Sequence, residues 1–544
     1  MAKGVTYSFI EHQLDDSIQL RKSFNFVNNY KLFSDMYRGN FSAEVEYVYN
    51  LYYSIFTSII ANTYRKNPKV FVKSDNPNDF FMAAAIQKIT NDWISPEDQN
   101  MKSLYRRTIL DTLLGGFGVI LVGSGGIFGR SKETVLNQFT REFPELFEGV
   151  SSPDEFHDEN DEFVWARRIP PYDVLFPYES SLDVVNMRFV AIRYYRKEEH
   201  IKRDKRYRGV SRGGFTLYDD KDDKEERAKS LGNTTSKTKW GMLWDYYDNE
   251  SGKIYTVIEG QEKIIKIEEM ITDRLPISVL KWTEDSEYAY PPSEASVLFD
   301  KQFDLITADA QERELRNTFK LMLFLNQNKI NKTEIDETQD STHTRGYVLI
   351  DGKPSENVMF GKYDVPNDIF KGKNQIEGNA RVEIGHGRNQ SGGESATRVT
   401  AAEARIIQAG GMVRVNERVD AVLESMEEVC LLAHKFRLEF WNTSRSIYIP
   451  RMGQTNFTKD DLYPEGKMNF EAIVYDAAPE HFETQRLYIL QALDRIGNMG
   501  IPISAQLRIL REAYPEVTAI AEIADMIEQQ EQQQQLQQQQ QAVP

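Results

Sequence analysis

The chain of 544 residues has few of the side chains from which disulfides and soft-metal sites are built. It contains one cysteine, Cys430, and seven histidines. A single cysteine excludes an internal disulfide framework and a cysteine-based zinc cluster, and no histidines stand in pairs at metal-ligand spacing on a helix. Because Cys430 lies in an apolar helical pattern, we expect a small buried side chain there rather than a nucleophile.

The chain also lacks a long apolar run. Residues 1–30 are interrupted by charged side chains, so they do not have the apolar core of a signal peptide. The most apolar stretch, residues 112–123, is far shorter than the roughly 20 residues of a membrane-spanning helix. We therefore expect a protein of a reducing, cytoplasmic compartment that does not enter a membrane.

Basic side chains are fewer than acidic ones. The chain has 83 acidic and 66 basic side chains, a formal net charge of −17. Proteins whose affinity for nucleic acid rests on phosphate contacts usually carry the opposite sign. The excess of acid is consistent with simple solubility and also with a surface that meets DNA without gripping it. Composition does not separate these two interpretations.

Motifs of catalytic chemistry are missing from the sequence. Residues 123–129, Gly-Ser-Gly-Gly-Ile-Phe-Gly, have neither the dinucleotide-binding nor the P-loop spacing, so we expect a turn between strands. The acidic residues at 158–162 lack the spacing of a calcium loop, and those at 245–252 are assigned to a hairpin turn. No Gly-x-Ser-x-Gly elbow is present. The sequence therefore predicts a protein that is not an enzyme and needs no cofactor or metal.

Hydrophobic periodicity predicts an α+β fold. In the first half we expect helices at 45–60, 80–94 and 100–114, and strands at 70–72, 119–122, 163–169, 174–176 and 189–195. A hairpin is expected at 240–258, around a turn at 248–252, with more strand up to residue 282. The charged segment 197–239 is expected to be a surface insertion or a flexible loop.

After residue 292 the apolar period changes from two to about 3.6, which favours helices. A long helix is expected from 294 to about 325, followed by a small mixed island with a strand at 346–350. The remaining expected elements are a helix at 367–384, a polar loop at 385–398, a helix at 400–440, strands within 446–475, helices within 479–527 and a glutamine tract at 529–541. Gly410 and Gly411 predict a kink in the helix at 400–440.

This order of parts resembles the portal, or head–tail connector, family of tailed bacteriophages. That family is built as a wing, a stem of two helices with a clip between them, a tunnel loop, a long kinked wing helix and a crown. Residues 51–72 look like its first helix and strand, and residues 111–122 like the helix–glycine–strand step of the wing. The segments 244–247 and 275–282 are similar to wing strands. Residues 391–403, Ser-Gly-Gly-Glu-Ser-Ala-Thr-Arg-Val-Thr-Ala-Ala-Glu, resemble the tunnel loop and the start of the wing helix.

The resemblance covers nearly the whole chain and implies a division into parts. These are a wing at 1–293 with a charged insertion at about 197–239, stem helix 1 at 294–325, a clip at 326–365, stem helix 2 at 366–384, a tunnel loop at 385–398, further wing at 399–478, a crown at 479–528 and a Gln-rich tail, expected to be disordered, at 529–544.

The same resemblance implies site residues. The tunnel loop is expected to line the DNA channel with Gly385, His386, Arg388, Asn389, Gln390, Glu394 and Arg398. Its arginines are expected to touch phosphates transiently, while Glu394 offsets part of that attraction. The clip is expected to bind an adaptor protein through Lys332, Glu334 and Asp336.

The implied function is a ring of twelve subunits at the capsid vertex, for packaging, retention and ejection of double-stranded DNA and for joining head to tail. Implied partners are the large terminase subunit, a head-completion adaptor, and the major capsid or scaffolding protein. The implied location is the virion, with the host cytoplasm during assembly. Two alternatives stay open: another phage tail or baseplate subunit, and a soluble enzyme with a site near residues 115–129.

Overall fold

The fold, as seen in a computed structural model, is of the α+β class that the sequence predicts. The structure describes residues 5–41, 49–64, 67–74, 80–125, 164–178, 183–203, 207, 215–217, 239–285, 290–318, 323–326, 347–350, 367–386, 401–441, 445–449, 453–463, 468 and 470–475. The chain forms two compact units. Unit 1 comprises Met1–Thr63 and Ser103–Asn442, and unit 2 comprises Tyr64–Lys102 and Thr443–Pro544.

The larger sheet of unit 1 is antiparallel and six-stranded. Its order is β4 (Val174–Leu175), β5 (Phe189–Lys197), β7 (Lys239–Asp248), β8 (Lys253–Ile258) and β9 (Ile264–Glu269), and β6 (Phe215–Leu217) also pairs with β7. The predicted hairpin is confirmed, because Asp248 pairs with Lys253 across a turn that contains Gly252 at φ +65°. One face is covered by helix α1 (Tyr7–Ser23), whose Ile10 and Leu14 pack against Trp244 and Tyr246.

A second sheet, of three strands, has the order β10 (Ile277–Lys281), β2 (Phe117–Ser124) and β3 (Val164–Ile169). Its apolar face and that of the larger sheet form one core around the fully buried Phe117, against which Phe26 stacks with ring centroids 5.5 Å apart. Phe26 belongs to α2 (Phe26–Arg38). The 3-10 turn η5 (Pro171–Asp173) and helices α3 (Leu51–Thr63), α5 (Met101–Gly115) and α8 (Glu198–Arg203) complete this region.

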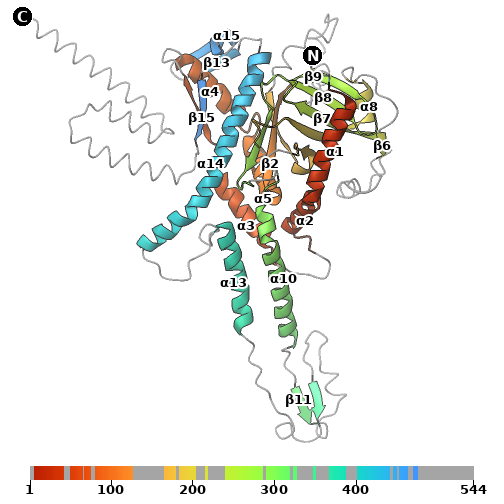
Figure 1. The fold of residues 1–544 in the computed structure, drawn as a ribbon. Helices are drawn as coiled ribbons and strands as arrows, with labels where there is room; N and C mark the ends of the chain where they lie inside the picture. The colour runs from red at the N-terminus through yellow and green to blue at the C-terminus, as the bar shows by residue number, and fades with distance from the viewer. Residues whose placement is uncertain are drawn as a thin grey trace, which may run out of the picture. The chain divides into compact units, whose positions relative to one another are not determined.

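Two long helices of unit 1 lie side by side (Figure 1): α10 (Glu294–Thr318) and α13 (Asn367–Ile384). Lys373 of α13 forms ion pairs with Asp309 and Glu312 of α10. Strands β11 (Leu323–Asn326) and β12 (Tyr347–Ile350) lie between them in the chain and pair in parallel, Leu323 opposite Tyr347. Helix α14 (Ala401–Phe440) follows and packs on β10 and β2.

Unit 2 joins distant parts of the chain. Strand β1 (Lys69–Ser74) pairs antiparallel with β15 (Phe470–Tyr475), and β13 (Arg445–Ile449) pairs with β14 (Gly453–Phe457). Helix α4 (Phe80–Ile94) contacts β1, β13 and α15 (Lys459–Leu462). The Asn91 side chain accepts the Val70 backbone N–H at 3.1 Å and donates to the Val70 carbonyl at 2.9 Å, which fixes α4 against β1.

Two sequence predictions about these elements are wrong. The helix expected through residue 325 ends at Thr318, and Leu323–Asn326 is a strand. Periodicity does not distinguish a short apolar run in a helix from one in a strand, and here pairing with β12 decides. The charged insertion is also not wholly a surface loop, since Ile201 and Tyr207 are buried against Leu243 and Ile258. The expected crown and Gln-rich tail lie outside the described residues.

Candidate functional site

Few of the residues expected to act in the channel or the clip lie in the described part of the chain. Gly385 and His386 are described, and Gly410 and Gly411 lie within α14, which is one unbroken helix. The kink at this glycine pair stays a prediction. The following candidates lie outside the described residues: Arg388, Asn389, Gln390, Glu394, Arg398, Lys332, Glu334 and Asp336.

Gly385 terminates α13 in a Schellman motif. Its N–H donates to the Val382 carbonyl at 3.0 Å, and the N–H of His386 donates to the Arg381 carbonyl at 2.8 Å. Gly385 has φ +68°, and a Cβ atom at this position would overlap the Arg414 side chain. Gly385 therefore caps α13, which ends at Ile384 as the sequence predicts, and its place in a tunnel loop stays a prediction.

His386 is buried as well, with a side-chain exposure of 0%. Its Nε2 atom lies 2.8 Å from Ser58 Oγ of α3. Burial, and then the nearby Arg418 and Arg381, lower the pKa of His386 to about 4, so the ring is neutral at pH 7. His386 thus has no exposed surface in the chain by itself, and the expectation that it lines a DNA channel stays a prediction. A Ser–His pair can activate a nucleophile, but among the described residues Nδ1 of His386 has no hydrogen-bond partner that would orient the ring.

Two arginines of α14 close the end of α13. Arg418 donates to the Ile384 carbonyl at 2.9 Å, and Arg414 donates to the Glu383 carbonyl at 2.8 Å. These carbonyls belong to the last turn of α13, and the carbonyl groups of a last turn have no hydrogen-bond partners within the helix. The positive charge of arginine also interacts favourably with the negative end of the helix dipole. Sequence reasoning missed both arginines.

Arg418 also reaches α10. Its Nη2 atom lies 3.6 Å from Oε1 of Glu294, the first residue of α10. Burial raises the pKa of Glu294 to about 7, and Arg418 opposes part of that effect. The start of α10, the end of α13 and the body of α14 therefore meet at one group of polar side chains, which we call the helix junction: the largely buried Glu294, His386 and Arg418, and the exposed Arg414.

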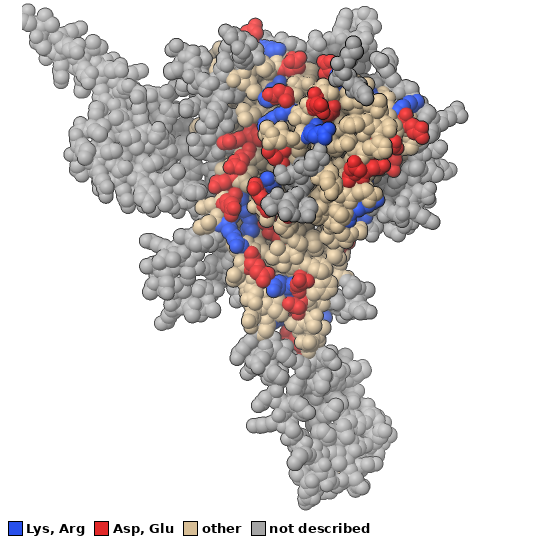
Figure 2. All heavy atoms as spheres, viewed as in Figure 1, with Lys and Arg blue, Asp and Glu red and all other residues tan. Residues whose placement is uncertain are grey.

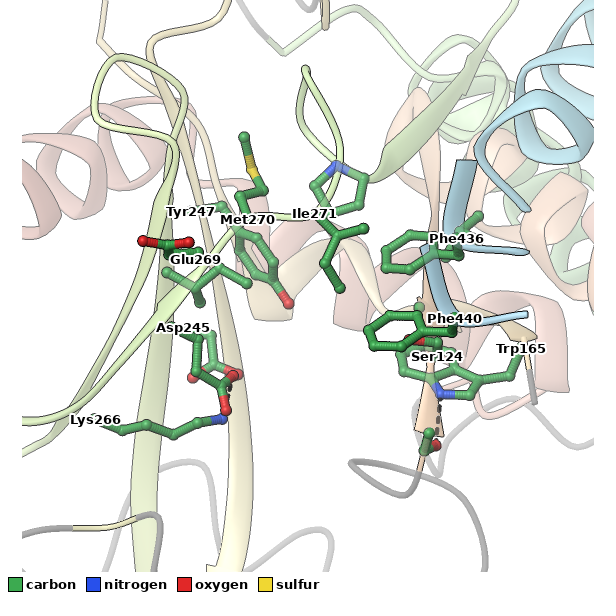
Figure 3. A pocket seen from close by; sticks show the side chains of 16 residues that line it. Ser124, Trp165, Asp245, Tyr247, Lys266, Glu269, Met270, Ile271, Phe436 and Phe440 are labelled. Carbon is green, nitrogen blue, oxygen red and sulfur yellow. Dashed lines mark hydrogen bonds and ion pairs between the residues drawn. The ribbon is translucent and has the colours of Figure 1, made fainter. Parts of the chain in front are cut away.

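A cavity of about 290 Å³ lies beside Val122–Gly125, where the sequence left an enzyme site open (Figure 3). Gly123 lies in β2, not in a nucleotide-binding loop, and a Cβ atom there would overlap the Trp165 ring. The Trp165 indole N–H donates to the Gly125 carbonyl at 3.1 Å, which holds the ring at the cavity wall. The glycine at 123 is thus explained by the close approach of a tryptophan.

The polar wall of this cavity follows from strand register. Asp245 and Tyr247 of β7 face the same way, and Thr256 of β8 pairs with both Asp245 and Lys266 of β9. Asp245 is buried and accepts hydrogen bonds from Thr256 Oγ1 at 2.5 Å and Tyr194 Oη at 3.1 Å. Burial raises the pKa of Asp245, although Lys266 acts in the opposite direction. Asp245 lies in strand β7, as the hairpin expected at 240–258 predicts, so grouping it with the acidic residues of the turn is wrong.

Among the described residues, no group of three or more His, Cys, Asp and Glu side chains is arranged to hold a metal ion. No helix within the described ranges is both long and apolar enough to cross a bilayer.

Comparison with known proteins finds no family model that matches the chain and no curated protein that is significantly similar to it.

Proposed function

We propose that this protein is a portal protein of a tailed bacteriophage, one subunit of a ring through which double-stranded DNA enters and leaves the head. The observation that carries the proposal is the helix pair α10 and α13, with the small β11–β12 unit between them in the chain (Figure 1). The 40-residue helix α14 comes next. These parts correspond to the stem, clip and long wing helix of the family that the sequence resembles. The tunnel loop then begins after the cap at Gly385 and His386.

The way α14 is held supports this assignment. Near its middle it ties the helix pair together through Arg418. Further along, Ser425 Oγ lies 2.9 Å from Ser278 Oγ of β10 and 3.3 Å from Tyr105 Oη of α5. One helix thus links the proposed stem to the proposed wing inside a single compact unit, as a subunit that bears load along a channel requires.

The charges on helix α10 support the proposal. Each phosphate that a protein neutralises adds affinity and salt dependence, which would slow a sliding duplex. Asp300 and Asp304 are exposed on α10, and none of the exposed side chains described on this helix is basic. Lys301 is held by Glu383 at 3.2 Å. The described face in Figure 2 carries acidic side chains over a wide area with basic ones between them.

In this proposal the subunits pack head to tail in a ring of twelve, so each presents two different faces. The terminase supplies ATP hydrolysis, and the portal itself is not an enzyme. The adaptor binds the clip at 326–365, and capsid or scaffolding protein binds outside, at the vertex of the virion.

Electron microscopy and native mass spectrometry of the full purified chain test the proposal. We expect pierced rings with the mass of twelve or thirteen 63.0-kDa chains. Charge reversal at Glu334 in the clip serves as the matched variant, because it should weaken adaptor binding and leave rings intact. Monomers and dimers alone at micromolar concentration would refute the portal function.

A further inference from the structure

The cavity beside β2 has two chemically different walls (Figure 3). On one side lie Asp245, Tyr247, Lys266 and Glu269, from strands β7 and β9. On the other side lie apolar and aromatic side chains from α14, β3 and the segment after β9: Phe436, Phe440, Trp165 and Ile271. A volume of about 290 Å³ is at the lower end of the range for small-molecule sites.

The polar wall offers hydrogen-bonding atoms that the protein does not use. Tyr247 is 7% exposed, and within the described part of the chain its hydroxyl has no hydrogen-bond partner. The hydroxyl points into the space between the two walls (Figure 3). Asp245 accepts both of its hydrogen bonds at Oδ1, and no described residue donates to Oδ2. Both side chains line the cavity, so these atoms can form hydrogen bonds with a molecule bound in it.

The charges select the kind of ligand. Lys266 is buried, pairs with Glu268 at 2.6 Å and also acts on Asp245, so one ammonium is shared between two carboxylates. Asp245 is then the carboxylate without an ionic partner at hydrogen-bonding distance among the described residues. An anionic ligand would be repelled by Asp245 and Glu268, and a neutral one would leave the carboxylate unbalanced. A cation is attracted by these carboxylates and balances their excess negative charge. The aromatic wall suits an organic cation rather than a hydrated metal ion.

We propose that this cavity binds a small organic amine in its ammonium form. The ammonium donates hydrogen bonds to Asp245 Oδ2 and to the Tyr247 hydroxyl. Its carbon skeleton packs against Phe436, Phe440 and the Trp165 ring. The site is independent of the portal function, because it uses only side chains within unit 1 and requires no second subunit.

Isothermal titration calorimetry on the full chain at pH 7 tests this with three ligands of one shape: 2-phenylethylamine, 2-phenylethanol and phenylacetate. We expect the amine to bind about tenfold more tightly than the alcohol, since charge-assisted hydrogen bonds are about twice as strong as neutral ones. Phenylacetate should not bind. Equal affinity for amine and alcohol, or binding of phenylacetate, would overturn the proposal, as would the absence of amine binding.

Variants locate the site. Tyr247→Phe removes one hydrogen-bond partner and should weaken amine binding roughly three- to tenfold. Asp245→Asn removes the charge and should reduce the preference for amine over alcohol. Glu259→Gln, at an exposed position in the turn between β8 and β9, is the matched control and should leave the affinity unchanged. Thermal unfolding checks that each variant folds, and unchanged binding in both folded cavity variants would rule this cavity out. Ring assembly is measured on the same samples, so failure of this site is distinguished from failure of the portal function.

Discussion

The helix junction contains two buried groups whose pKa values are displaced in opposite directions, and this predicts a specific pH dependence of stability. The pKa of Glu294 is raised from 4.5 to about 7, chiefly by burial. The pKa of His386 is lowered from 6.5 to about 4, again chiefly by burial. His386 is fully buried and the Glu294 side chain is 12% exposed, so solvent screens neither group strongly.

The sign of each effect follows from proton binding. Between pH 4.5 and 7 the folded state keeps the Glu294 proton that the unfolded state has lost, so the stability from Glu294 is present at low pH and lost as pH rises. Between pH 6.5 and 4 the unfolded state takes up a His386 proton that the folded state refuses, so this stability is lost as pH falls. Each shift corresponds to about 3 kcal/mol over its window. In the wild type the two slopes nearly cancel between pH 4.5 and 6.5.

Single substitutions should therefore expose the slopes. Relative to the wild type, Glu294→Gln should gain about 3 kcal/mol in the free energy of unfolding as pH rises from 4.5 to 7. His386→Gln should lose about as much as pH rises from 4 to 6.5. Urea unfolding followed by tryptophan fluorescence suits the measurement, because the Trp282 ring lies under the Arg418 guanidinium at 5.3 Å. Curves for both variants that run parallel to the wild type over this range would show that these groups titrate normally.

Two further substitutions test how the fold is held. Asp111 is buried, accepts a hydrogen bond from the Tyr30 hydroxyl at 2.7 Å and forms an ion pair with Arg168. Asp111→Ala should therefore lower the free energy of unfolding by about 3 kcal/mol. This is near the lower end for a broken buried ion pair, because the Arg168 side chain is 29% exposed. The double variant Asp111→Leu with Arg168→Met should recover much of that loss, because it leaves no unpaired charge. If the single and the double variant lose the same free energy of unfolding in urea, the unpaired Arg168 charge is not the cause of the loss. Gly385→Ala should lower stability by at least about 1 kcal/mol, through its positive φ and its overlap with Arg414. Gly378→Ala, in the same helix with open space around it, should raise stability by about 0.5–1 kcal/mol, and effects of the same sign at both glycines would contradict the cap.

Elements set by local pattern were predictable from the sequence. Helix α4 has the bounds expected from its amphipathic pattern, and α13 forms in spite of Gly372 and Gly378. The hairpin of β7 and β8 was predictable because its turn residues lie between two runs rich in aromatic and branched side chains. In each case the deciding interactions lie within a few residues along the chain.

Elements set by distant contacts were not predictable. The segment Gly-His-Gly at 385–387 has the composition of an exposed loop, yet His386 is buried against Ser58, which lies 328 positions earlier. Arg414 and Arg418 look like ordinary charges on a helix until the end of α13 meets them. Composition describes what a segment can do in water and carries no information on which remote element will cover it.

One wall of the cavity depends on local sequence pattern, and the other depends on contacts between distant parts of the chain. Its polar wall depends on the β7–β8–β9 meander, in which tight turns set Thr256 opposite both Asp245 and Lys266. Ionisable residues at alternate positions of neighbouring hairpin strands are therefore a signal that a sequence can carry. The aromatic wall comes from Phe440, at the far end of α14, and no local pattern places that residue near β7. A sequence can thus indicate that one face of a sheet is polar, whereas only the packed fold shows that aromatic side chains from a distant helix lie opposite it and form a cavity.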